Sequence, residues 1–111
     1  MSLVYSTNRL EEFEKIGSCI FIRLGEEIVN SGEDGEEQYQ YYQARVKVTG
    51  KLLRDTIIES IIRAKYPSYG AELAAQFNGG DELQEHQAWR ATAKEKADYL
   101  IDNFFRITQG N

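Results

Sequence analysis

The chain has few of the residues that most often form catalytic and metal sites. Its 111 residues include one cysteine, one histidine, one proline, one tryptophan and one methionine. The single cysteine, Cys19, allows neither a disulfide within the chain nor a thiolate metal cluster. The single histidine, His86, cannot form a site that needs several histidines, and no nucleophile motif such as G-x-S-x-G accompanies it. We therefore expect no metal, no cofactor and no enzymatic activity.

Long apolar runs and an excess of basic residues are also missing. No stretch reaches the roughly 20 apolar residues that span a bilayer, and the first residues lack the basic and apolar regions of a secretory signal. The net charge of -5 argues against binding to nucleic-acid phosphates, which requires a basic face. These absences predict a cytoplasmic protein that binds neither membranes nor nucleic acid.

The most regular pattern in the sequence is an apolar helical one at Lys51–Tyr66. At 100° per residue its apolar side chains share one broad arc, formed by Leu53, Ile57, Ile58, Ile61, Ile62 and Ala64. An arc covering about half of a helix must pack against at least two neighbours, so we expect this helix to lie between a sheet and another helix. The chain length fits one core, which predicts a single domain over residues 1–111.

The segments before the central helix are predicted to be a helix and a β-hairpin. Residues 8–15 place Leu10 and Phe13 at helical spacing, and Gly17 follows as a stop. Residues 18–29 and 39–49 alternate with a period of two around the acidic turn 30–38. A two-stranded hairpin is only marginally stable in isolation, so it must lie on the central helix, gain a strand or pair with another chain.

Two more helices are predicted after the central one. Ser68 can cap a short helix that places Tyr69 and Phe77 on one side. Asp81 with Gln84 resembles a capping box for a long last helix over residues 81–105. The predicted fold is therefore α+β in the order α-β-β-α-α-α, with the hairpin packed on the central helix and the last helix across the same core. Residues 1–3 are left outside this fold.

The acidic segment 26–37 has the composition of a calcium loop but not its spacing. An EF-hand with its glycine at Gly35 needs a side-chain ligand at Gly32 and a glutamate at Tyr41. The segment is therefore interpreted as a solvated hairpin tip or as a docking surface for a basic protein, the candidate residues being Glu33, Asp34, Glu36 and Glu37.

Acidic pairs on the last predicted helix invite a magnesium interpretation. They resemble the paired carboxylates of small all-α nucleotide pyrophosphohydrolases, which lie on facing helices. Here all four lie on one helix and spread over much of its surface, so they cannot converge on one ion and are expected to be solvated; they are Glu82, Glu85, Glu95 and Asp98.

Two tyrosines and one arginine are candidates for protein contacts. Tyr39 and Tyr41 belong to a group of tyrosines that is large for a small core, and tyrosine is enriched at interface anchors. The alternative is that they are core residues. Arg54 falls within the apolar arc of the central helix, where it either extends its stem to water or pairs with acids of the hairpin or of a partner chain.

Three segments resemble small proteins encoded in prophages of Bacteroides-type gut bacteria, near tail and tail-fibre genes. They are NRLEEFEKIGSCIFIRL at 8–24, YYQARVKV at 41–48 and RDTIIESIIRAKY at 54–66; Trp89, Arg90, Ala93 and Lys94 extend the similarity. The resemblance implies a structural or assembly role, with a virion-associated location, and supplies no catalytic residues. We expect a non-enzymatic protein that binds other proteins and forms homo-oligomers; the alternative is a small acidic adaptor or inhibitor that uses the loop 26–37.

Overall fold

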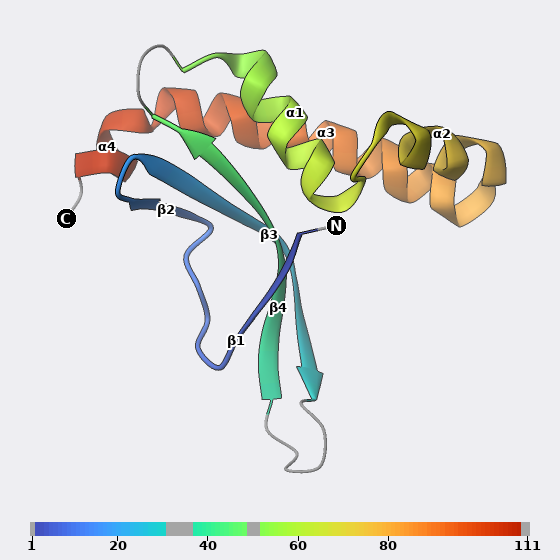
Figure 1. Cartoon of the computed structure of the whole chain (residues 1–111), viewed down its shortest axis with the longest axis horizontal. Coiled ribbons are helices and arrows are strands. Elements are labelled where there is room, and N and C mark those ends of the chain that lie inside the picture. Colours follow the sequence, from blue (N-terminus) through green and yellow to red (C-terminus); the bar gives the residue numbers. More distant parts are fainter. Residues whose placement is uncertain (1, 31–36, 49–51, 110–111) are drawn as a thin grey trace.

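The computed structural model describes residues 2–30, 37–48 and 52–109 (Figure 1). A four-stranded antiparallel sheet comes first, and four helices follow. The strands are β1 (Leu3–Ser6), β2 (Phe13–Ile16), β3 (Cys19–Asn30) and β4 (Glu37–Lys47), and their order in the sheet is β1-β4-β3-β2. The helices are α1 (Arg54–Lys65), α2 (Tyr69–Asn78), α3 (Gly80–Asp102) and α4 (Phe104–Gln109).

The fold is α+β, but the predicted order α-β-β-α-α-α is wrong at its start. The segment expected to form a helix at 8–15 instead contributes β2, which pairs with β3 in the register Phe13↔Ile22 to Ile16↔Cys19. Gly17, with φ of 63°, forms the turn of this hairpin rather than a helix stop. The helical spacing of Leu10 and Phe13 did not determine the structure, because β2 pairs with the edge of β3 across the turn at Gly17.

Leu3 belongs to the sheet, which corrects its exclusion from the predicted fold, whereas Met1 lies outside the described residues. The backbone N–H of Ser2 donates to the carbonyl of Ala64 at 2.8 Å, and Leu3 begins β1. β1 pairs with β4 from Leu3↔Tyr42 to Ser6↔Tyr39. The predicted β3–β4 hairpin therefore gains a strand on each side.

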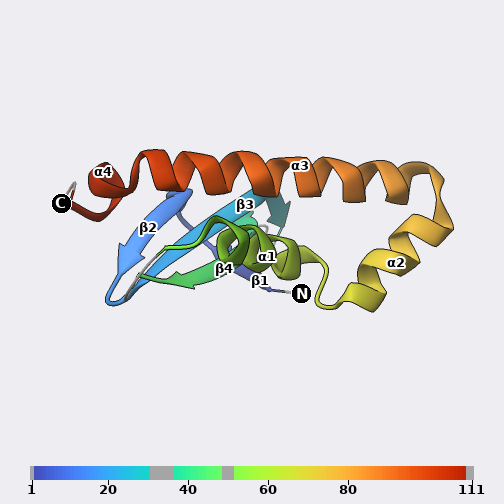
Figure 2. The same ribbon diagram turned by 90° about the horizontal axis from the view of Figure 1, so that it is seen from above.

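Most of the predicted apolar arc of α1 is buried in the core, but Leu53, at the N-cap of α1, is exposed. Figure 2 shows α1 over the sheet with α3 running alongside it, so α1 lies between β4 and α3 as predicted. The sheet, α1 and α3 contribute buried side chains to one cluster. They are Ile20, Ile22, Leu24, Ala44 and Val46 from the sheet, Ile57, Ile61, Ile62 and Ala64 from α1, and Trp89, Ala93, Ala97 and Leu100 from α3.

The last three helices differ from the prediction in their ends. Ser68 caps α2 as expected, because its hydroxyl accepts the N–H of Ala71 at 3.1 Å. The capping box at Asp81 and Gln84 is wrong: α3 begins at Gly80, and its N-cap is Gly79, which has no side chain to cap with. The predicted single helix is also interrupted at Asn103, after which α4 begins.

The helices and the sheet extend in different directions from the shared core. α2 and the first half of α3 project beyond the sheet, while the far half of the β3–β4 hairpin projects away from the helices (Figure 1). The molecule is correspondingly flat, with extents of 39 × 39 × 18 Å. Both projecting regions therefore have surfaces that do not pack against the core.

Gly25 sits at a register shift in β3 and is expected to be sensitive to substitution. Its φ is 68°, and a Cβ would lie 3.1 Å from Cδ2 of Tyr42. We expect Gly25→Ala to lower the free energy of unfolding by about 1–2 kcal/mol, from backbone strain and crowding together. Gly17→Ala is the matched control, because its φ is 63° but a Cβ there meets nothing within 4 Å. Urea unfolding that shows equal losses for the two variants would contradict the crowding.

Candidate interaction surfaces

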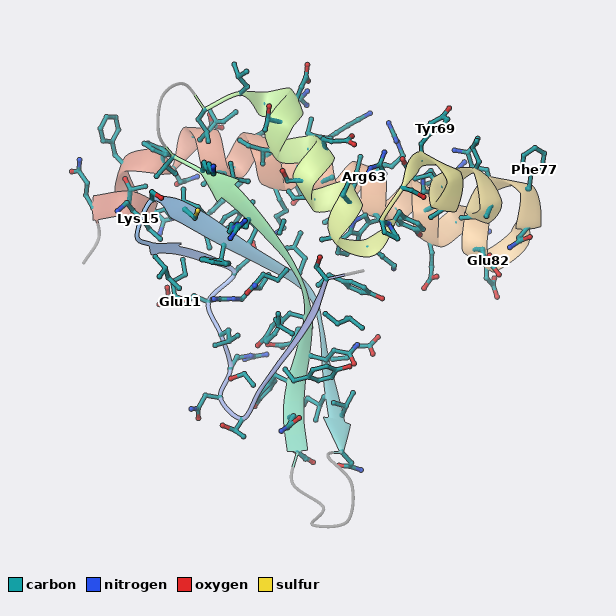
Figure 3. All side chains as sticks on the ribbon, in the orientation of Figure 1. Glu11, Lys15, Arg63, Tyr69, Phe77 and Glu82 are labelled. Carbon is teal, nitrogen blue, oxygen red and sulfur yellow. The ribbon has the colours of Figure 1, made fainter. Side chains whose placement is uncertain are left out.

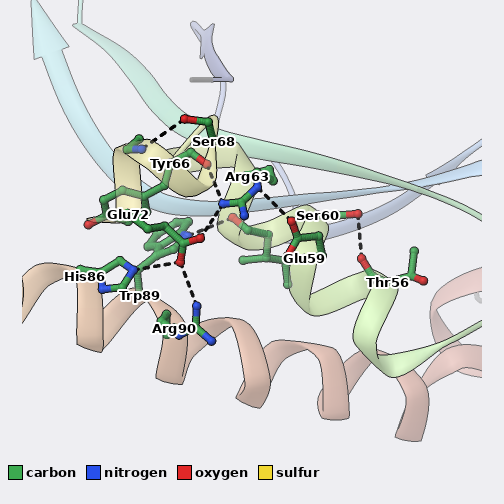
Figure 4. A network of polar contacts seen from close by, with 12 residues as sticks. Thr56, Glu59, Ser60, Arg63, Tyr66, Ser68, Glu72, His86, Trp89 and Arg90 are labelled. Carbon is green, nitrogen blue, oxygen red and sulfur yellow. Dashed lines mark hydrogen bonds and ion pairs between the residues drawn. The ribbon is translucent and has the colours of Figure 1, made fainter. Parts of the chain in front are cut away.

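The most polar buried feature is a cluster around Glu72 of α2 (Figure 4). Its Oε1 is 2.9 Å from His86 Nε2 and accepts a hydrogen bond from Arg90 at 2.8 Å. Its Oε2 accepts a hydrogen bond from Arg63 at 2.8 Å. One carboxylate thus joins α2 to α1 and to α3, which we call the Glu72 cluster (Glu72, Arg63, His86 and Arg90).

The Glu72 carboxylate is ionised despite its burial. Burial alone would raise its pKa, but the hydrogen bonds from His86, Arg63 and Arg90 together lower it to about 2. Both carboxylate oxygens are occupied, and the His86 ring is buried against Tyr66 with ring centres 5.0 Å apart. Neither group is open to a substrate, so the cluster attaches α2 to the rest of the molecule.

A second polar cluster fixes Tyr41 inside the protein. Its hydroxyl donates to Glu26 at 2.7 Å and accepts the N–H of Leu10 at 3.0 Å. Arg9 binds the same carboxylate through two hydrogen bonds, and the bonds from Arg9 and Tyr41 lower the pKa of Glu26 to about 2. Burial raises the pKa of Tyr41. Tyr41 is therefore buried, in agreement with the core alternative, whereas Tyr39 is half-buried beside β1. Contact through Tyr39 stays a prediction.

Only the two ends of the acidic segment 26–37 lie within the described residues. Glu33, Asp34 and Glu36 lie outside the described residues, and Glu37 is the exposed first residue of β4. At the other end of the segment, Glu26 is already bound to Arg9. The acidic adaptor stays a prediction.

Arg54 forms the ion pair that was one of its two predicted roles, but with a different partner. Its Nε lies 2.6 Å from Oδ1 of Asp98 on α3, not near an acid of the hairpin. Both side chains are about half exposed, and an exposed pair of this kind contributes at most about 1 kcal/mol. It ties α1 to α3 within the molecule.

A cleft with a volume of about 680 Å³ lies between β2 and α4. Phe13 stacks on Tyr99 at its side, with ring centres 5.3 Å apart. Two of the three carboxylates that line it are engaged elsewhere: Glu12 pairs with Lys96 at 2.9 Å, and Glu14 pairs with Arg23 at 2.7 Å. Among the residues that the structure describes, no group of three His, Cys, Asp or Glu side chains could hold a metal ion.

An uncharged apolar face lies on α2, at the projecting end of the molecule. Figure 3 shows Tyr69 and Phe77 pointing away from the sheet, and these rings are 65% and 86% exposed. The one charged residue of α2 is Glu72, which is buried in its cluster. We call Tyr69, Leu73 and Phe77 the α2 face. The helical spacing of Tyr69 and Phe77 was visible in the sequence, but the exposure of their rings was not.

The outer edge of β1 is a second uncovered surface. β1 pairs with β4 on one side, and no other strand of the described residues neighbours it. Its sequence, LVYS, carries no charge and no proline, and Tyr5 is exposed. Sequence reasoning missed this edge because residues 1–3 were left outside the fold, although the run Leu3-Val4-Tyr5 has the composition of a short strand.

Comparisons of the chain with models of protein families, with curated proteins and with solved structures gave no match. None of the helices in the described residues is long and apolar enough to cross a membrane.

Proposed function

We propose that this protein is a non-enzymatic assembly protein of phage origin that binds copies of itself. The observation that carries the proposal is the α2 face, where two aromatic rings lie largely in water. Exposed aromatic side chains on a projecting helix are typical of protein contacts, because burying them on a partner removes a large apolar area from water.

The absence of charge on the α2 face favours a second copy as the partner. The whole chain has a net charge of -5, so copies of it repel one another over most of their surfaces. Contact through an uncharged helix avoids adding like charges to the interface. The resemblance to prophage tail-region proteins supports the same kind of role, in which repeated copies build a larger structure.

Static light scattering tests this proposal. We expect the average mass to exceed the 12.7 kDa of one chain and to rise with protein concentration. Phe77→Ser should lower the average mass at a given concentration, because it removes the most exposed ring. Phe105→Ser is the matched control, since that ring on α4 is 74% exposed but lies outside the α2 face. A mass of one chain at every concentration would overturn the proposal.

A further inference from the structure

We propose a second contact between copies, in which the β1 edges of two molecules pair antiparallel about a two-fold axis at Val4. This inference rests on the proposed function, because it assumes that copies of the chain associate. This interface is distinct from the α2 face, and pairing there would join two four-stranded sheets into one.

The hydrogen-bonding pattern within the sheet determines which backbone groups of β1 are free. The N–H of Gln43 donates to the carbonyl of Ser2, which gives Ser2 and Gln43 one bond of a hydrogen-bonded pair, while the Ser2 N–H donates to Ala64. Such pairs alternate along an antiparallel ladder, which directs the groups of Val4 and Ser6 toward β4. The N–H and C=O of Leu3 and Tyr5 therefore point to the outer edge, and none of the hydrogen bonds between described residues uses them.

These four outward groups match those of a second copy in one register. If Val4 lies opposite Val4 of the other molecule, Leu3 lies opposite Tyr5 and Tyr5 lies opposite Leu3. Each of these two pairs can exchange both N–H···O=C bonds, because Leu3 and Tyr5 are the residues whose groups point outward. The register uses every free donor and acceptor of β1 and obeys the symmetry of an isologous dimer.

The two edges of the sheet differ in how well they are protected against such pairing. β2 carries the charged residues Glu14 and Lys15, and α4 packs beside it. Charge and a covering helix are the usual devices that prevent edge pairing. β1 has neither, and its uncharged side chains add no repulsion between two copies of an acidic protein.

The length of β1 limits how strongly the edges can hold two copies together. Stable dimers usually bury about 1,200–2,000 Å² in total, and a four-residue edge falls short of that area. The contact is therefore concentration-dependent and reinforces association through the α2 face, which lies on a different part of the molecule.

Cysteine cross-linking in a Cys19→Ser background tests the register. In the proposed dimer the two copies of residue 4 form a non-hydrogen-bonded pair, whose Cα atoms lie about 4.5 Å apart and can be joined by a disulfide. Two copies of residue 5 lie roughly 8 Å apart, which is too far. In a glutathione redox buffer we expect Val4→Cys to give about ten-fold more covalent dimer than the matched control Tyr5→Cys, although residue 5 is the more exposed.

The outcomes separate this inference from the proposed function. Preferential cross-linking of Val4→Cys supports the edge pairing. Equal cross-linking of the two variants, or none in either, overturns it. If light scattering of the unmodified chain still gives a mass above one chain that falls with Phe77→Ser, the proposed function stands while the edge pairing fails. A mass of one chain throughout removes the proposed function itself.

Discussion

Replacing Glu72 with glutamine is expected to lower the free energy of unfolding by about 3 kcal/mol, because a buried carboxylate with charged partners is lost. Glutamine keeps the shape of the side chain but has one amide NH2 in place of an oxygen. In either orientation that NH2 faces an arginine, Arg63 or Arg90, and a guanidinium cannot accept a hydrogen bond from it. Urea unfolding followed by far-UV circular dichroism measures the loss.

The exposed Glu59 provides the matched control for this substitution. It pairs with the same Arg63 at 2.9 Å, but its side chain is 60% exposed. We expect Glu59→Gln to change the free energy of unfolding by less than about 0.5 kcal/mol. Equal effects of Glu59→Gln and Glu72→Gln would contradict the role of the buried cluster.

The effect of Glu72→Gln should depend on pH. The folded-state pKa of about 2 lies below the ordinary value of 4.5, so the carboxylate stabilises the folded state fully above pH 4.5. Protonation removes this contribution as the pH falls toward 2. The difference between the unmodified chain and Glu72→Gln should therefore shrink over that range. Glu26, whose pKa is also about 2, cancels in this comparison because both proteins contain it.

The second large effect is expected at Trp89, where alanine should cost about 3–5 kcal/mol in the free energy of unfolding. The indole ring is buried in the core and meets the edge of Tyr42, with ring centres 5.4 Å apart. Its N–H donates to the carbonyl of Ile61 at 2.9 Å, and the ammonium of Lys65 lies 5.1 Å from its ring. Alanine would leave a cavity at the meeting point of α1, α3 and the sheet.

Tyr99→Ala is the control for the Trp89 substitution. Tyr99 is an aromatic residue on the same helix, but it is 42% exposed and stacks on Phe13 at the cleft. Its loss should cost roughly 1 kcal/mol. Both variants are measured by the change in circular dichroism during urea unfolding, since the fluorescence of the single tryptophan is lost in one of them. A Trp89→Ala protein as stable as Tyr99→Ala would contradict the central packing of the indole.

Strong local patterns in the sequence predicted the central part of the fold. The apolar arc of α1 and the alternation in β3 and β4 each reflect burial on a known face, so periodicity was informative. The four-residue strands β1 and β2 carried too few residues for a period to be decided. Their conformation depends on pairing with β3 and β4, which is a tertiary contact that local spacing does not encode.

The polar clusters were less predictable from the sequence than the strands and helices were. Glu72 meets Arg63, His86 and Arg90 only because α2 folds back beside α1 and α3. Nothing in the sequence identified Glu72 as the partner of the buried His86. Tyr41 was assigned to a contact surface because tyrosines are numerous, whereas the bonds from its hydroxyl to Glu26 and Leu10 satisfy it inside the protein.

The strand order β1-β4-β3-β2 constrains when the sheet can be completed during synthesis of the chain. Growth on the ribosome proceeds from the N-terminus, so β1 is made first, but its neighbour β4 is made last of the four strands. β2 and β3 are separated by Gly17 and Ser18 and can pair as soon as both have emerged. The first strand to be synthesised is therefore the last that can enter the native sheet. Until it does so, the edge of β4 that it covers stays unpaired.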